Sequence, residues 1–283
     1  IAQCLVGSEM CIRDRNIERP DPVDPRPRIE VEGLTIRNED GILKLKDVSF
    51  TANSGEILGI AGISGCGQKE LLEAIAGLQV TESGRISYVE EDGTKEELIG
   101  MDPRKIAEKG VSLSFVPEDR LGMGLVGNMD LTDNMMLRSF RRGHSPFTNR
   151  KSPRKLAEDV VESLEVVTPG ITTPVRRLSG GNVQKVLVGR EIASAPTVLL
   201  TAYAVRGLDI NSSYTIYDLI NEQKKKGVAV IFVGEDLDVL LELSDKILVL
   251  CGGEVSGIVD ARNTDKNEVG MLMTRVGGRK DHE

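Results

Sequence analysis

The chain has 283 residues, enough for one large α/β domain or two small ones with a sizeable core. A formal charge of -8, no tryptophan and only 3% aromatic residues disfavour a phosphate-backbone surface and base-stacking platforms, so we expect no nucleic-acid partner. No apolar run approaches the roughly 20 residues of a membrane-spanning helix. The four cysteines form no CxxC pair, which favours reduced thiols and argues against a zinc site.

The first segment, residues 1–15, shows no periodicity. Its stretch Leu5–Asp14 back-translates, with permitted codons, into a transposon adapter used in sequencing-library preparation. We therefore predict that residues 1–15 are adapter read-through, that the gene extends upstream and that the chain is a C-terminal fragment. A signal peptide is the alternative, but its apolar core would be too short and is interrupted by Glu9 and Arg13.

Residues 16–28 carry several prolines among charges, which favours an extended linker and a domain boundary. The stretches Ile29–Ile36 and Leu43–Phe50 then alternate apolar and polar residues like paired antiparallel strands. The apolar stretch Glu56–Ala61 predicts another strand, which runs through glycines into a helix over Lys69–Leu78. The order is therefore strand, glycine-rich loop, helix.

The middle of the chain is predicted to be a helical subdomain, at about residues 119–177. A strand from Val111 leads into it, and Leu131–Val166 has mostly helical patterning. We expect its basic stretches, Arg138–Arg142 and Arg150–Lys155, to form a solvated helical face. A position near the membrane or the permease loops is the alternative.

The last third of the chain alternates strands and helices. The predicted strands are Val198–Ala202, Val228–Val233 and Lys246–Leu250, and the predicted helices are Gly180–Ala193, Ile210–Lys226 and Asp236–Leu243. Such alternation indicates a mostly parallel sheet covered on both faces. The fold class is therefore α/β, with one domain over residues 29–275 and a polar tail over 276–283.

The glycine loop resembles a phosphate-binding loop of the form G-x-x-x-x-G-K-[ST]. In that loop, backbone N–H groups and a helix N-terminus surround the phosphates, the lysine reaches the outer phosphates and the hydroxyl binds magnesium. Here Gln68 replaces the lysine, and Lys69 and Glu70 replace hydroxyl positions. Alone the match is weak, since a tight turn explains it equally well. In chain order the loop reads Gly62, Ile63, Ser64, Gly65, Cys66, Gly67, Gln68, Lys69, Glu70.

A second motif opens the predicted helix after residue 179. It places a hydroxyl and two small residues at a helix N-terminus, where free backbone donors can approach a phosphate. A serine N-cap followed by glycines is the plainer interpretation, but the motif is long and a helix and a strand follow it. In chain order it reads Leu178, Ser179, Gly180, Gly181, Asn182, Val183, Gln184, Lys185.

Five motifs in this order resemble those of ABC transporter ATPases, and the resemblance covers nearly all of Ile29–Thr274. They are Gly62–Glu70, Val116–Arg120, Leu178–Lys185, Arg206–Asp209 and Gly234–Asp238. In detail they resemble the second cassette of tandem ATPases that energise bacterial importers of simple sugars and nucleosides. The variants Gly67–Glu70 and Glu235–Asp238 are closer to the nucleoside branch than to the ribose branch. The resemblance implies a P-loop NTPase-like ABC ATPase domain.

The same resemblance shows which functional residues this chain lacks. The family's magnesium-binding aspartate falls at Ala202, its water-activating glutamate at Tyr203, its switch histidine at Glu235 and its coupling glutamine at Glu118. No aromatic residue stands between residues 36 and 42, where the family places an adenine-stacking ring. Because phosphoryl transfer needs positioned charge and metal together, we expect no metal site and little or no hydrolysis by the chain's own loop.

Cassettes of this family act as head-to-tail pairs, each nucleotide lying between one phosphate loop and the other signature. The resemblance therefore implies that Ser179, Gly180 and Gly181 complete the ATP site of a partner cassette in the same full-length chain. Asp209 would couple the two sites. The loop Gly62–Glu70 would be a binding-only or empty pocket, with magnesium expected at the partner site only. Leu178, Asn182 and Gln184 complete the candidate nucleotide-binding set.

The implied setting is the cytoplasmic face of the cell membrane, with permease subunits as direct partners and an extracytoplasmic solute-binding protein as an indirect one. A non-catalytic regulatory or scaffold module that binds nucleotide is the alternative. A soluble ABC protein of translation or DNA repair would carry coiled-coil insertions or a basic arm, and neither is present in the sequence.

Overall fold

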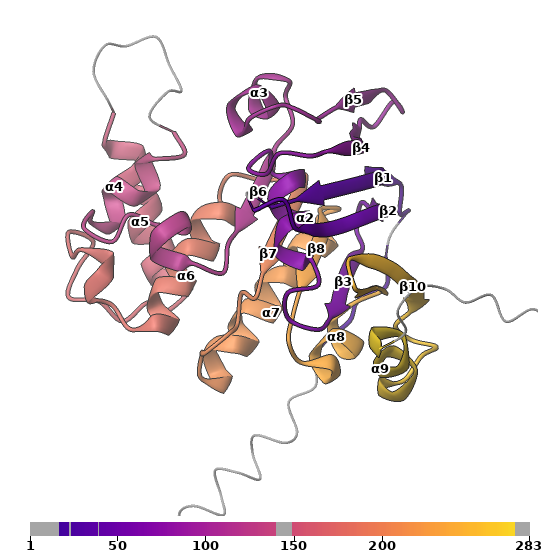
Figure 1. Ribbon diagram of the computed structural model, residues 1–283. Coiled ribbons are helices and arrows are strands. Elements are labelled where there is room, and N and C mark those ends of the chain that lie inside the picture. Colours follow the sequence, from indigo (N-terminus) through magenta and orange to yellow (C-terminus); the bar gives the residue numbers. More distant parts are fainter. Residues whose placement is uncertain (1–16, 23, 39, 140–148, 275–283) are drawn as a thin grey trace, which may run out of the picture.

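The computed structural model describes residues 17–274, apart from residues 23, 39 and 140–148. The predictions for residues 1–15 and 276–283 therefore lie outside the described residues. The chain forms two sheets with helices around them (Figure 1). The strands are β1 (Pro27–Arg37), β2 (Leu43–Asn53), β3 (Ile57–Gly62), β4 (Ser83–Val89), β5 (Lys95–Glu97), β6 (Leu113–Val116), β7 (Val198–Ala202), β8 (Ala229–Val233), β9 (Lys246–Cys251) and β10 (Glu254–Asp260). The helices are α2 (Gln68–Ile75), α3 (Pro103–Glu108), η1 (Arg120–Gly124), α4 (Leu131–Met136), α5 (Lys151–Ser163), η2 (Val175–Arg177), α6 (Gly180–Ile192), α7 (Ile210–Lys225), α8 (Leu237–Leu243) and α9 (Lys266–Thr274).

The core sheet has the strand order β10-β9-β3-β8-β7-β6. The pairs β3·β9, β3·β8, β7·β8 and β6·β7 are parallel, and only the edge strand β10 runs antiparallel to its neighbour. Parallel strands need crossover connections, which α2, α6, α7 and α8 supply between them. The carboxyl ends of β3, β6, β7 and β8 consequently share one edge, where open α/β sheets bind ligands.

A second sheet, of order β2-β1-β4-β5, is antiparallel throughout. The apolar residues Ile29, Val31, Leu34 and Ile36 of β1 are all buried, and the alternation shifts by one residue between Val31 and Leu34, where the strand is irregular. The antiparallel N-terminal region and the mostly parallel core sheet confirm the predicted α/β fold class.

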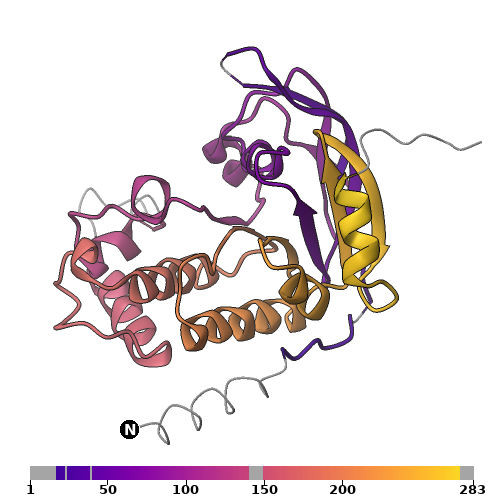
Figure 2. The ribbon, with the colours of Figure 1, turned by 60° about the horizontal axis from the view of Figure 1, so that its bottom comes forward.

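The two faces of the core sheet bury separate sets of apolar residues. Along β7, Leu199 packs with residues of α6, α7 and α8, whereas Leu200 packs with α2 and the antiparallel sheet. This alternation follows from the two-residue repeat of a strand. The molecule is therefore layered, with helices on one face of the core sheet and α2 with the second sheet on the other (Figure 2).

Helices α4 and α5 lie to one side of both sheets, with α4 packed against α5 and α5 against α6, so the predicted helical region is present (Figure 1). Its limits at residues 119–177, and those of the domain at 29–275, stay predictions.

The described residues before β1, 17–26 without residue 23, form no helix or strand but contact the domain. The Arg19 guanidinium donates to the carbonyl oxygens of Leu241 (2.8 Å) and Ser244 (3.1 Å) at the end of α8. Ile17 packs against the helix-covered core, and Glu18 accepts a hydrogen bond from Asn221 of α7. The predicted linker is thus held along α7 and α8 over its described part.

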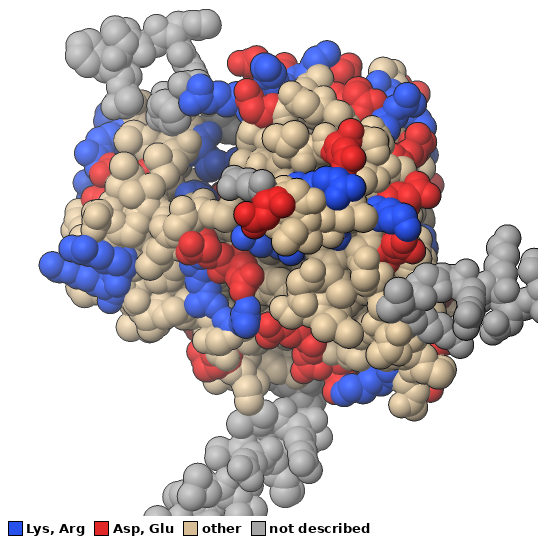
Figure 3. Space-filling model, viewed as in Figure 1, with Lys and Arg blue, Asp and Glu red and all other residues tan. Residues whose placement is uncertain are grey.

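Positive and negative side chains are interspersed over the face seen in Figure 3. Within the described residues, none of the helices combines the length and the apolar character needed to cross a membrane.

Candidate functional site

The glycine loop joins β3 to α2 and requires glycine at its last position. Gly67 has φ +99°, and a Cβ there would lie 2.4 Å from Leu45 Cδ2 and 2.7 Å from the Lys44 carbonyl oxygen. Gly65 also has a positive φ, +87°, but a Cβ there would have no neighbour within 4 Å. The loop therefore lies tightly against β2 at Gly67.

We predict that Gly67→Ala destabilises the chain by about 2–4 kcal/mol, because left-handed strain adds to steric overlap. Gly65→Ala is the matched control and should cost only about 1–2 kcal/mol, since it suffers the backbone strain alone. Urea unfolding measures both. Equal losses would contradict the close contact with Leu45.

The side chains at the lysine and hydroxyl positions of the loop are held by contacts within the chain. Gln68 is 2% exposed, and its Nε2 donates to the Ile63 carbonyl oxygen at 3.4 Å, so a neutral amide folds back across the loop. Lys69 lies along α2, with its Nζ 3.7 Å from Glu73 Oε1. Glu70 faces Lys44 at 3.8 Å. Gln68 is uncharged, Lys69 is directed along α2 toward Glu73, and the carboxylate of Glu70 repels phosphate. None of the three therefore takes the place of the phosphate-binding lysine.

At the carboxyl ends of β6, β7 and β8 an ion-pair cluster joins the predicted degenerate positions. Arg206, in the loop after β7, pairs with Glu118 after β6 and, through Nε at 3.1 Å, with Glu235 after β8. The same guanidinium lies 6.0 Å from the centre of the Tyr203 ring. Tyr203 is held at φ +51°, an uncommon conformation for a bulky residue.

These groups do not fit a magnesium ion. Ala202 offers a buried methyl group at the end of β7. Burial, followed by the nearby carboxylates of Glu118 and Glu235, raises the pKa of the Tyr203 hydroxyl. That hydroxyl stays protonated and cannot act as a base at neutral pH. A cavity of about 250 Å³ beside Ala202 is lined by charged side chains of both signs, namely Lys69, Glu73, Glu118 and Asp119.

The signature turn, in contrast, is fully formed. Ser179 caps α6: its Oγ accepts from the Asn182 side-chain amide at 2.8 Å and from the Asn182 backbone N–H at 3.5 Å. The Asn182 Oδ1 in turn accepts from the Val167 backbone at 2.9 Å. Ser179 and Gly180 are exposed, which leaves the first backbone donors of a helix of 13 residues at the surface.

The loop after β7 packs against this turn. Asp209 caps α7, accepting from the Ser212 backbone N–H at 2.9 Å and from its hydroxyl at 2.7 Å. These bonds lower the pKa of the Asp209 carboxyl. A Cβ on Gly181 would lie 2.9 Å from Ser212 Oγ, so only glycine allows this approach. Asp209 and the signature thus form one surface.

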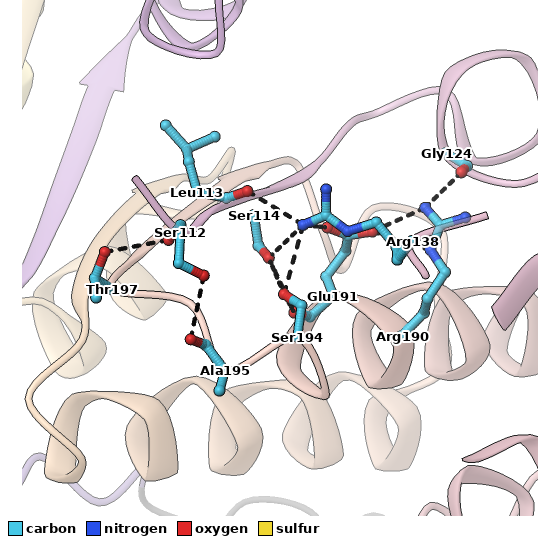
Figure 4. A network of polar contacts seen from close by, with 10 residues as sticks. All are labelled: Ser112, Leu113, Ser114, Gly124, Arg138, Arg190, Glu191, Ser194, Ala195 and Thr197. Carbon is cyan, nitrogen blue, oxygen red and sulfur yellow. Dashed lines mark hydrogen bonds and ion pairs between the residues drawn. The ribbon is translucent and has the colours of Figure 1, made fainter. Parts of the chain in front are cut away.

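A polar network connects the helical region to the edge of the core sheet (Figure 4). Glu191 of α6, with its side chain 3% exposed, pairs with Arg190 and with Arg138, each at 2.9 Å. Arg138 also donates to Ser114 of β6 at 2.9 Å, and Arg190 to the Gly124 carbonyl oxygen at 2.7 Å. Arg138 is exposed, as the prediction of a solvated basic stretch requires, but it follows the end of α4 and pairs with the buried carboxylate of Glu191. The last residues of that basic stretch, 140–142, lie outside the described part of the chain.

The structure therefore brings the predicted residues together in two groups. Glu118, Tyr203 and Glu235 meet at Arg206 and form the first group, while Gln68 folds back across the glycine loop. The signature group contains Ser179, Gly180, Gly181, Asn182 and Asp209. Sequence analysis placed Arg206 and Arg120 within motifs but gave neither a role, although Arg206 joins the first group and Arg120 lies beside the second. Their positions directly after strand ends were the available signal.

A glycine loop between β3 and α2 and a serine-capped glycine turn opening α6, on this layered fold, define the class of ATP-binding cassettes. The sequence profile of the ABC transporter family matches residues 45–201, and the chain belongs to that family.

Curated relatives with similar sequences are import ATP-binding proteins. Guanosine import ATP-binding protein NupO of Bacillus subtilis (strain 168) is 34% identical over 96% of this chain and 52% of the relative. Xylose import ATP-binding protein XylG of Moorella thermoacetica is 36% identical over 89% of this chain and 49% of the relative. The chain spans about half the length of the curated relatives it matches.

Solved structures support the fold. The dimeric post-hydrolysis state of the ATP-binding cassette MJ0796, bound to ADP and Pi, matches with a TM-score of 0.69 at 22% identity. The match covers 83% of this chain and 100% of that chain. At this identity the likeness shows the fold alone, and it agrees with the predicted P-loop NTPase-like ABC domain.

Proposed function

We propose that the chain is the second, degenerate cassette of a tandem ATPase that energises an importer of nucleosides or simple sugars. It donates its signature to the ATP site of the first cassette and hydrolyses little or no ATP at its own loop. One observation carries the proposal: the signature turn is intact and exposed, whereas the positions that would serve the chain's own nucleotide form an ion-pair cluster.

The cluster argues against hydrolysis on physical grounds. Arg206 is the cation nearest to Glu118 and Glu235, and it is already paired with both. With Ala202 and Tyr203 in place of carboxylates, no oxygen shell for magnesium and no base for water remains at the end of β7.

The remaining parts of the proposal follow from the family and from the relatives. Their length supports a first cassette upstream, in the same full-length chain and joined by the proline-containing segment before β1. Permease subunits, a solute-binding protein acting through them, and a peripheral position at the cytoplasmic face of the membrane are proposed on the same basis. ATP, with magnesium, would be held chiefly at the first cassette's loop. The guanosine and nucleoside import relatives favour the nucleoside branch.

The purified chain alone tests the proposal. We expect no ATP hydrolysis above a protein-free control, because no group among the described residues positions metal and water together. The full-length protein with its permease serves as the positive control. Phosphate release measured over hours checks this. Turnover by the isolated chain that disappears with Gly67→Asp would contradict the proposal.

A non-catalytic scaffold module is the second candidate, supported by the Gln68 amide that fills the loop. Equilibrium binding of ATP to the isolated chain separates the two in part. No measurable affinity at millimolar ATP favours a pure scaffold at this loop, and measurable affinity favours a binding-only site.

A further inference from the structure

Arg120, on the loop after β6, links the two surfaces that surround the signature turn. One guanidinium nitrogen, Nη2, donates to the carbonyl oxygen of Arg206 in the loop before α7. The other, Nη1, lies beside the turn, where a Cβ on Gly180 would be 3.1 Å away. The side chain is thus held on one side and reaches the first residue of α6 on the other.

The charge of Arg120 is not compensated by a carboxylate in the part of the chain that the structure describes. The neighbouring Arg206 has two carboxylate partners, whereas the contact of Arg120 is to a carbonyl oxygen. Burial lowers the pKa of the Arg120 guanidinium, yet the group stays charged at neutral pH. A partly buried cation without an anionic partner indicates that an anion outside the chain completes its environment.

A buried polar side chain near the start of α6 lacks a hydrogen-bond partner. Gln184 is 1% exposed, and neither its Nε2 nor its Oε1 has a hydrogen-bond partner among the described residues. Gln184 lies one turn after Gly180 on the same face of α6, and helical side chains lean toward the helix N-terminus. The first two turns of α6 therefore carry a buried amide without a partner, and Arg120, a cation without a carboxylate partner, lies beside the first of these residues.

We propose that Arg120 is a further nucleotide-binding residue, acting in trans with the signature on the terminal phosphate of a nucleotide held by the partner cassette. This inference rests on the proposed function. The exposed N-terminus of α6 offers backbone donors and positive potential, and the guanidinium adds charge-assisted hydrogen bonds of the geometry that phosphate oxygens prefer.

The proposed contact of Arg120 affects the binding of ATP but not that of ADP. The signature approaches a nucleotide from the side of its terminal phosphate, so loss of Arg120 removes contacts that only a triphosphate makes. A residue that merely holds the loop after β6 in place would instead affect both nucleotides alike.

The test uses the full-length tandem protein with its permease and compares equilibrium binding of a non-hydrolysable ATP analogue and of ADP. For Arg120→Gln we expect at least a tenfold loss of analogue affinity and less than a twofold change for ADP. Arg154→Gln is the matched control, because Arg154 lies on α5 and pairs only with its exposed helix neighbour Glu158; it should change neither affinity. Equal or absent changes for Arg120→Gln would overturn the proposal.

Two further variants keep the outcome interpretable. Arg120→Lys keeps the charge without the forked pair of N–H donors, and we expect a two- to fivefold loss of analogue affinity. If Arg120→Gln does not fold, an unchanged affinity in Arg120→Lys overturns the proposal.

Ser179→Arg tests the proposed function itself. If it leaves analogue binding unchanged, the donated signature is wrong; if it weakens binding while Arg120→Gln does not, only the role of Arg120 is wrong.

Discussion

Replacing Ser179 with arginine in the full-length protein is expected to lower ATP hydrolysis by about 100-fold, the scale of losing a preorganised donor at a phosphate or oxyanion site. The variant removes the hydroxyl at the signature turn and places a long side chain over the backbone donors of α6. The chain itself should remain folded, since loss of an N-cap costs about 1 kcal/mol. Steady-state phosphate release by the protein with its permease measures the effect.

Ser163→Arg is the matched control for this variant. Ser163 is exposed at the end of α5, so the same substitution adds the same charge to the helical region away from the signature. Hydrolysis by this control should stay within twofold of the unmodified protein. Unchanged hydrolysis in Ser179→Arg would mean that the signature serves no ATP site.

Replacing Glu191 with alanine is expected to destabilise the chain by about 3–5 kcal/mol, the cost of breaking a buried ion pair by removing one partner. Its side chain and that of Arg190 are 3% and 7% exposed. Without the carboxylate, Arg190 is left buried beside Arg138 with no compensating charge at this position (Figure 4). Urea unfolding, monitored by circular dichroism, measures the loss.

Glu158→Ala serves as the control, because Glu158 pairs with an arginine at the surface of α5. Exposed pairs of this kind contribute about 0.3–0.5 kcal/mol, so the control should unfold almost as the unmodified chain does. Glu191→Gln should fall between the two, since it keeps hydrogen bonds but loses the charge. A loss below about 1 kcal/mol for Glu191→Ala would contradict the network as a stabilising contact.

The fold was predictable where apolar periodicity is strong. The fully buried run Val198–Ala202 could only be a core strand, and β7 has those bounds. The apolar pattern does not predict β4, β5 and α3. Strand β4 is buried only in its second half, and β5 and α3 are short and polar. The pattern also does not predict β10, an edge strand whose residues are mostly half-buried and which contains Gly257.

The site was predictable as a list of positions but not as a set of contacts. The losses at Ala202 and Tyr203 follow from motif order alone. The pairing of Arg206 with Glu118 and Glu235 joins the ends of three strands far apart in sequence, and no periodicity encodes it. The inward turn of Gln68 and the positive φ of Tyr203 likewise depend on packing that only the folded chain fixes.

If this cassette completes a neighbour's ATP site and does not use its own, nucleotide trapped during turnover must lie on the neighbour. Vanadate trapping of a photoreactive ADP in the full-length protein, followed by proteolysis and mapping of the label, tests this most directly. We predict label in the first cassette and its loss in Ser179→Arg. Label within residues 62–70 of this chain, retained in Ser179→Arg, would contradict the account.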